Sequence, residues 1–199
     1  MSTDGGLHIG ILVFDEAEEL DVVGPFEVLA AWEQHSAIKP HVSTFSHDGE
    51  GVRLAKGLRM VPARSADDVG PLHLLVHPGG WGTRALIADP GHLEWLRMVH
   101  AQTPVVAAVC TGTLVLAAAG LLAGRPATTH RDHYDELARI DPSVLVDTEA
   151  RFVDDGDVVT SAGVSAGIDM ALHLVARLES PEVARRVRGA LQYDPDPPV

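Results

Sequence analysis

The sequence has only one cysteine, Cys110, among its 199 residues. It can therefore form no internal disulfide, and a chain built without disulfides is expected in the cytoplasm. Basic residues are also scarce, since 15 lysines and arginines stand against 28 acids and the formal net charge is −13. Because the basic residues are scattered, we do not expect this chain alone to bind nucleic acid. The acidity is interpreted as a solvated surface.

Long apolar runs are missing as well, although hydrophobic residues make up 46% of the chain. No run approaches the roughly 20 residues that a membrane-spanning helix needs, and the N-terminus lacks the charged-then-apolar pattern of a signal peptide. The sequence shows no repeat, linker or low-complexity segment. We therefore expect a single globular domain over residues 1–199, with no membrane partner.

What the sequence does have is an alternation of short apolar runs with amphipathic stretches, which predicts alternating strands and helices. The main strands are expected at 7–14, 38–46, 72–76, 105–109 and 157–160. The helices are expected at 22–32, 90–101, 113–119, 133–140, 164–178 and 182–191. Smaller strands are expected at 52–55 and 58–62, as a hairpin, and at 144–148 and 151–153. This order predicts an α/β fold, a three-layer αβα sandwich around a mainly parallel sheet with flavodoxin-like strand order.

Cys110 lies between a buried strand and a helix that Gly120 should terminate. A tight strand-to-helix turn is the device with which hydrolases expose a nucleophile, so the sequence predicts a cysteine nucleophile elbow. The amides that open the helix should favour the thiolate and lower the pKa of the thiol. A lone cysteine is also often a small buried hydrophobe, and position alone does not separate the two interpretations.

Two further strand ends carry chemistry-bearing residues. Asp21 follows the first strand, in an acid-rich segment, 15–21, that is otherwise expected to be a solvated turn. Gly79 and Gly80 follow the strand at 72–76, where adjacent glycines let backbone amides approach a ligand or simply form a tight turn. In open α/β sheets ligands bind at the carboxyl ends of the strands, so these residues are candidate binding residues.

Five segments in this order resemble the ThiJ/PfpI superfamily, relatives of the class I glutamine amidotransferases. They are Glu18-Glu19-Leu20-Asp21 with Gly24-Pro25, Pro78-Gly79-Gly80, Ala107-Ala108-Val109-Cys110-Thr111-Gly112, Ala127-Thr128-Thr129-His130 and Thr160-Ser161-Ala162-Gly163. The resemblance covers nearly the whole chain. The branch it is most similar to is isonitrile hydratase, in which the acid is Asp and the elbow reads Cys-Thr-Gly.

The resemblance implies a role for each of these residues. Cys110 matches the nucleophile, and Asp21 matches the acid that touches its sulfur and shuttles a proton. The amides of Gly80 and Thr111 match the pair that stabilises an anion. His130 matches a histidine near the pocket in some branches, but it can equally be a core histidine bonded to backbone.

The implied reaction adds water to an isonitrile and gives an N-substituted formamide through a thioimidate on Cys110. It needs a small-molecule substrate and no metal or organic cofactor. No histidine or cysteine pair has convincing metal-ligand spacing, so no metal site is expected. The family associates through its first helix, and a face made of Val22, Phe26 and Leu29 with Trp32 predicts a homodimer.

Other members of the superfamily provide the alternatives. Glyoxalase-type and deglycase-like members usually carry Glu at the position of Asp21, and protease-like members carry His at the position of Thr111. The same domain forms the sensor half of some AraC-type regulators, which continue into a basic helix-turn-helix segment, whereas this acidic chain ends at Val199. A redox or stress-response protein, with Cys110 oxidised to a sulfinate, is the remaining alternative.

Overall fold

The computed structural model describes residues 6–196, which form a seven-stranded sheet in the order β10-β11-β7-β6-β1-β2-β5. Every neighbouring pair is parallel except β10 and β11, which are antiparallel. The five central strands follow the flavodoxin-like order, with the switch point between β1 and β6. The strands of this sheet are β1 (His8–Leu12), β2 (His41–Ser46), β5 (Arg64–Ser65), β6 (Leu74–His77), β7 (Val105–Val109), β10 (Phe152–Asp154) and β11 (Val158–Ser161).

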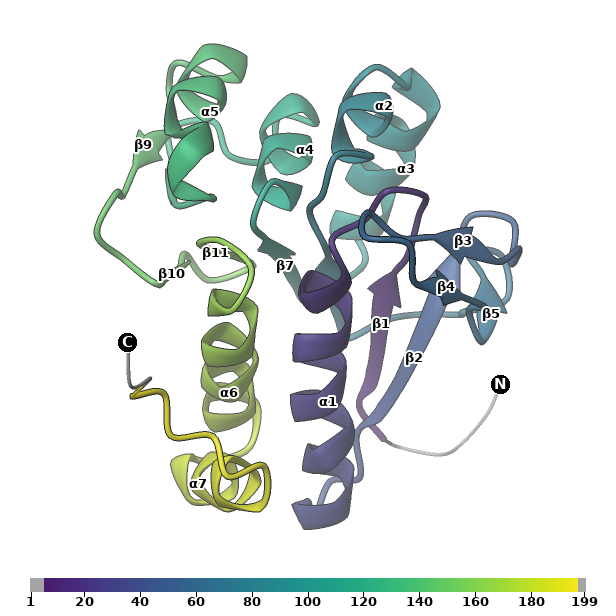
Figure 1. The fold of residues 1–199 in the computed structure, drawn as a ribbon, viewed down its shortest axis with the longest axis vertical. Helices are drawn as coiled ribbons and strands as arrows, with labels where there is room; N and C mark the ends of the chain where they lie inside the picture. The colour runs from purple at the N-terminus through teal and green to yellow at the C-terminus, as the bar shows by residue number, and fades with distance from the viewer. Residues whose placement is uncertain (1–5, 197–199) are drawn as a thin grey trace.

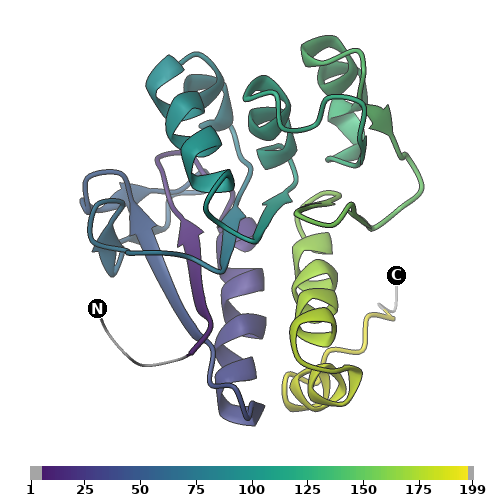
Figure 2. The ribbon, with the colours of Figure 1, turned by 180° about the vertical axis from the view of Figure 1, so that it is seen from behind.

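Helices cover both faces of the sheet, which confirms the predicted three-layer sandwich (Figures 1 and 2). On one face α1, α6 and α7 pack together, and α3 and α4 lie on the other. The helices are α1 (Glu19–His35), α2 (Thr83–Ile87), α3 (Pro90–His100), α4 (Gly112–Ala118), α5 (Tyr134–Ile140), α6 (Ala166–Leu178) and α7 (Pro181–Ala190), with a 3₁₀ turn at Arg131–His133. Among residues 6–196, no helix is long and apolar enough to cross a bilayer.

The central strands are buried on both faces, which explains their continuous apolar sequences. All five residues of β7 are buried, as are all four of β6. The largest completely buried side chains include Trp32 and Phe45. This rigid layer brings the ends of β1, β6 and β7 to one edge of the sheet.

The smaller elements differ from the prediction in instructive ways. The predicted hairpin is present as β3 (Val52–Arg53) paired antiparallel with β4 (Arg59–Met60). The helix α2 and the edge strand β5 were not expected. The strand β9 (Leu145–Val146) is shorter than the strand expected at 144–148, and it pairs parallel with the two-residue strand β8 (Pro126–Ala127). Elements of two to five residues have too few positions to show a hydrophobic period, so the sequence pattern does not reveal them.

The first helix begins earlier than predicted, at Glu19. Asp21 therefore lies in its first turn and not on a turn before the helix, and Pro25 lies inside the helix. Val22 and Trp32 belong to the apolar face that was predicted to form the dimer interface, but both are completely buried within the chain. They belong to the core, so they give no support to the predicted homodimer.

Candidate active site

The chain brings its predicted site residues together at the carboxyl ends of the parallel strands. Asp21 lies in the first turn of α1, Gly79 follows β6, and Cys110 follows β7. The Gly79 amide donates to Asp21 Oδ2 at 3.0 Å, and the Gly80 amide donates to Thr111 Oγ1 at 2.9 Å. A Cβ on Gly79 would lie 2.6 Å from the Thr111 nitrogen and 2.9 Å from Asp21 Oδ2. Glycine is therefore required for this close approach.

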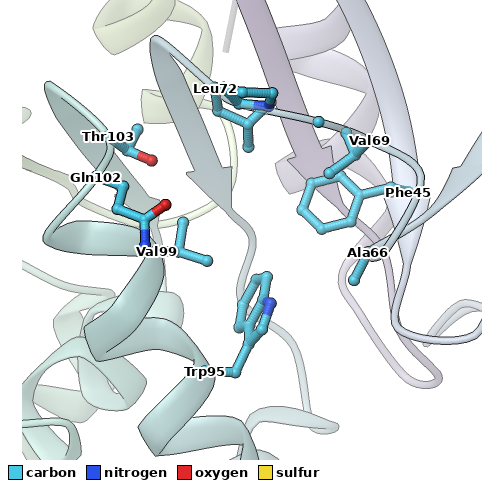
Figure 3. A pocket seen from close by; sticks show the side chains of 10 residues that line it. Phe45, Ala66, Val69, Leu72, Trp95, Val99, Gln102 and Thr103 are labelled. Atoms are coloured by element: carbon cyan, nitrogen blue, oxygen red, sulfur yellow. The ribbon is translucent and has the colours of Figure 1, made fainter.

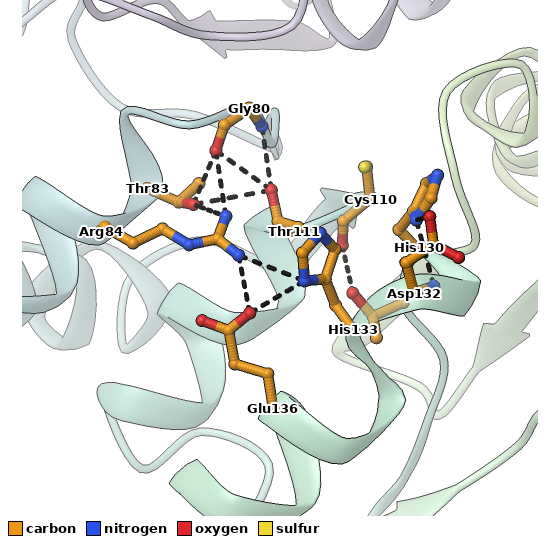
Figure 4. A network of polar contacts seen from close by, with 10 residues as sticks. Gly80, Thr83, Arg84, Cys110, Thr111, His130, Asp132, His133 and Glu136 are labelled. Atoms are coloured by element: carbon orange, nitrogen blue, oxygen red, sulfur yellow. Dashed lines mark hydrogen bonds and ion pairs between the residues drawn. The ribbon is translucent and has the colours of Figure 1, made fainter.

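Cys110 occupies the predicted elbow between β7 and α4 (Figure 4). Its φ of 57° is in the left-handed region, which is strained for a residue with a side chain. Three hydrogen bonds hold it there. The Cys110 amide donates to the Ser161 carbonyl at 3.1 Å, and the Cys110 carbonyl accepts from Thr129 Oγ1 at 2.7 Å and from the Thr113 amide at 3.3 Å.

The sulfur of Cys110 is reached by two backbone amides, those of Val164 and Thr111, which favour its anionic form. Val164 was not among the predicted site residues. Its φ of 41° is in the left-handed region, which is rare for a β-branched residue. The predicted partner of Thr111, the Gly80 amide, is instead bonded to the Thr111 hydroxyl. The only sequence signal for Val164 is its place after the Thr160–Gly163 motif.

Asp21 is completely buried, and this burial is the main cause that raises the pKa of its carboxyl to about 7. The charge of Glu18 acts in the same direction, while the Gly79 amide, the Cys110 thiol and the Lys56 charge lower the pKa. Near neutral pH the carboxyl can therefore both accept and donate a proton.

The thiol of Cys110 differs from the prediction. Burial first, and then the charge of Asp21, raise the pKa of the thiol to about 12, against the opposing amides of Val164 and Thr111. The predicted lowering of the thiol pKa is wrong because the side chain is only 6% exposed and α4 has seven residues. At neutral pH the Cys110 side chain is therefore a neutral thiol, and the adjacent Asp21 carboxylate is a base available to it.

His130 lies at the edge of the site. Its Nδ1 accepts a hydrogen bond from the Asp132 amide at 3.2 Å, as the N-cap of a 3₁₀ turn. The ring packs directly on Gly163, where an added Cβ would lie 2.2 Å from His130 Cδ2. Beside it is a cavity of about 330 Å³. The cavity is lined mainly by polar residues, namely His130, Arg131, Tyr134, Thr148, Glu149 and Arg151, with Ala150, Ala162, Gly163 and Val164.

A polar network that the sequence did not predict borders the elbow (Figure 4). Arg84 pairs with Glu136 at 2.6 Å, and His133 Nδ1 contacts the same Glu136 oxygen at 2.8 Å. The Arg84 guanidinium also stacks on the ring of Trp81, which is 69% exposed, at 5.1 Å. These contacts join α2 to α5. They also reach the Gly80 carbonyl oxygen, which lies 3.5 Å from Arg84 Nη1.

A second cavity, of about 90 Å³, lies near the amino ends of β6 and β7 (Figure 3). Its lining includes Leu72, which precedes β6, and Thr103, which precedes β7. It is too small for most ligands and remote from the elbow. Within the described part of the chain, no group of three or more His, Cys, Asp or Glu side chains could hold a metal ion.

Comparison with known proteins agrees with this geometry. The chain is 38% identical to isonitrile hydratase from Pseudomonas putida over 96% of its own length and 81% of that protein. It is 28% identical to the HTH-type transcriptional regulator GbdR from Pseudomonas aeruginosa over 94% of its own length but only 50% of that protein. The crystal structure of a ThiJ/PfpI family protein from Pseudomonas syringae matches with a TM-score of 0.88 and 33% identity, over 98% of this chain and 78% of that chain. The DJ-1/PfpI family model matches residues 8–177, and the chain belongs to that family.

Proposed function

We propose that this protein is a cysteine-dependent hydratase that adds water to an isonitrile and releases an N-substituted formamide. The observation that carries the proposal is the 38% identity to isonitrile hydratase over 96% of the chain. The buried pair of Cys110 and Asp21 supports it, because the reaction needs one soft nucleophile and one group that moves protons. More broadly, this similarity supports the view that the protein is a lyase-type enzyme.

In the first half of the reaction the Asp21 carboxylate takes the thiol proton, and the sulfur of Cys110 attacks the terminal isonitrile carbon. The proton returns from Asp21 to that carbon, which gives a thioimidate, R–N=CH–S. The pKa of Asp21, about 7, suits both transfers at neutral pH. The amides of Val164 and Thr111 stabilise negative charge on the sulfur during the attack.

In the second half a water molecule adds to the C=N bond. Asp21 accepts a proton from this water and supplies one to the nitrogen, so the adduct carries N–H, O–H and C–S groups. Collapse breaks the C–S bond, the hydroxyl becomes the formyl carbonyl, and its proton restores the Cys110 thiol. The substituent R then occupies the 330 Å³ cavity beside His130 and Val164.

Formamide release from an isonitrile tests the proposal directly, with methylglyoxal consumption as the competing activity. Cys110→Ala should abolish hydration. Asp21→Asn should lower turnover by ~10²-fold or more while preserving the fold, the usual scale for general acid–base catalysis. Asp21→Glu should lower hydration and favour oxidised Cys110. Wild-type turnover in Asp21→Asn would show that another group moves the proton.

A second candidate function is ligand sensing without turnover, and the GbdR similarity favours it, since this chain matches half of that regulator. Cys110 would then bind or record a ligand, or become oxidised, beside Asp21. Binding of an isonitrile without formamide release, weakened in Cys110→Ala, would support this function over hydration.

We also propose a homodimer as the working form. The apolar residues exposed on α1 are Leu20 and Val23, which are 38% and 37% exposed. Leu58, 49% exposed, lies next to them because its amide reaches Glu19 Oε1 at 3.4 Å. Light scattering should give twice the chain mass of 21.1 kDa at micromolar concentration, and Val23→Glu should halve it.

A further inference from the structure

Three histidines outside the site form a continuous hydrogen-bonded chain that ends beside it. His47 Nε2 lies 2.8 Å from His92 Nδ1, and His92 Nε2 lies 3.2 Å from His77 Nε2. At the inner end, His77 Nδ1 lies 2.8 Å from the Pro78 carbonyl oxygen. His77 and His92 are buried, whereas His47 reaches the surface.

Only one set of tautomers satisfies all three contacts. The Pro78 carbonyl can only accept, so the proton of His77 is on Nδ1 and its Nε2 accepts from His92. His92 then carries its proton on Nε2 and accepts at Nδ1 from the Nε2–H of His47. All three rings are neutral, in accord with burial, which lowers the pKa of His77 to about 4 and that of His92 to about 3.

The inner end of this chain holds one particular peptide group, the bond between Pro78 and Gly79. Its carbonyl accepts from His77 Nδ1, and its N–H donates to Asp21 Oδ2 at 3.0 Å. Because a peptide group is planar, the direction of the carbonyl fixes the direction of the amide. The Pro78 oxygen also lies only 2.8 Å from the place of a Cβ on Gly112, so the plane has little freedom to rotate.

We propose that His77, its tautomer fixed by His92 and His47, is a positioning residue that aims the Gly79 amide at Asp21 and so sets how readily Asp21 releases its proton. The proposal rests on the proposed function only in giving that proton a use in hydration.

Other charged or titratable groups also act on these residues. Those that act on Asp21 are Glu18, Lys56 and Cys110. His47, at the outer end, faces the charges of Asp48 and Asp89. His47 lowers the pKa of both His77 and His92, and His77 also lowers that of His92. None of the inner rings titrates near the pKa of Asp21, so titration of Asp21 can be followed separately from theirs.

Two substitutions of His77 test whether its hydrogen bond to the Pro78 carbonyl, and not only the volume of its ring, positions the Gly79 amide. The side-chain amide of Asn can place an N–H where Nδ1 lies, whereas that of Gln reaches only the position of Nε2. His77→Gln should therefore lose the donor to Pro78, weaken the Gly79 bond to Asp21, and raise the titration midpoint of Asp21 by about one pH unit. His77→Asn should leave this midpoint within a few tenths of a unit of the wild-type value.

The readout is the carboxyl ¹³C resonance of Asp21, assigned by its loss in Asp21→Asn, and it requires no substrate. Equal midpoints in the two His77 variants would overturn the proposal. Should the His77 variants not fold, His92→Phe with His92→Gln as its control makes the same comparison, because only Gln keeps a donor toward His77. The pH dependence of kcat for formamide release, measured in parallel, tests the proposed function separately. A shifted resonance without any formamide would reject the hydratase and retain the positioning role.

Discussion

Replacing Asp21 by Asn should stabilise the protein at alkaline pH, even though it removes the proposed proton shuttle. Asp21 is completely buried, and one of its oxygens, Oδ1, accepts no hydrogen bond of standard geometry from residues 6–196. Ionisation places a charge in this poorly compensated position. Asn has the shape of the protonated acid and cannot ionise, so it avoids the penalty.

The size and pH range follow from the pKa of Asp21, which folding raises from 3.8 to about 7. Because the folded-state pKa is raised, the contribution of Asp21 to stability is complete below pH 3.8 and is lost progressively as pH rises to about 7. One pH unit of pKa change is worth about 1.4 kcal/mol, so the whole loss is about 4 kcal/mol. About 3 kcal/mol of it falls between pH 5 and pH 8.

Urea unfolding of wild type and Asp21→Asn at pH 5 and pH 8 measures this effect. The free energy of unfolding of Asp21→Asn, relative to wild type, should rise by about 3 kcal/mol between these two pH values, with unchanged m-values. Subtracting the two proteins cancels the histidines and other groups that titrate. Repeating the pair in a Cys110→Ala background removes the coupling to the thiol. A difference between the proteins that does not depend on pH would refute the buried, proton-binding state of Asp21.

Three further predictions concern the surroundings of the elbow. Gly79→Ala should break the hydrogen bond from the Gly79 amide to Asp21 and lower the free energy of unfolding in urea by about 1–3 kcal/mol. The control is Gly189→Ala, which has nothing within 4 Å of the new Cβ and should be stabilising by ~0.5–1 kcal/mol. Thr129→Val should cost about 1–3 kcal/mol by removing the donor to the Cys110 carbonyl, while Thr129→Ser keeps it, and equal losses would contradict this role. The alkylation rate of Cys110 should keep rising above pH 8.5 and shift to lower pH in Asp21→Asn, and a plateau below pH 8 in wild type would show that the thiol is activated after all.

The sequence predicted those parts of the site that depend on local patterns. The apolar run at 105–109, followed by Cys110 and a helix, defines an elbow in any parallel sheet, and Asp21 and Gly79 follow neighbouring strands. The pKa of Cys110 was not predictable, because it depends on how deeply the packed fold buries the sulfur. The Val164 amide could not be predicted either, since no local pattern in the sequence reveals the positive φ angle of that residue. The histidine chain joins residues far apart in sequence, and no spacing rule connects them.

Cys110 and the Val164 amide that acts on its sulfur both have strained backbone angles, which the surrounding structure must stabilise. Cys110 and Val164 have φ angles of 57° and 41°, and conformations of this kind cost about 1–3 kcal/mol each. The end of β11 serves both, because Ser161 accepts the hydrogen bond of the Cys110 amide and Val164 follows three residues later. A change in 161–164 should therefore disturb the elbow and the sulfur donor together. Thr129 contacts the Cys110 carbonyl from another segment, so its variants report on the elbow alone.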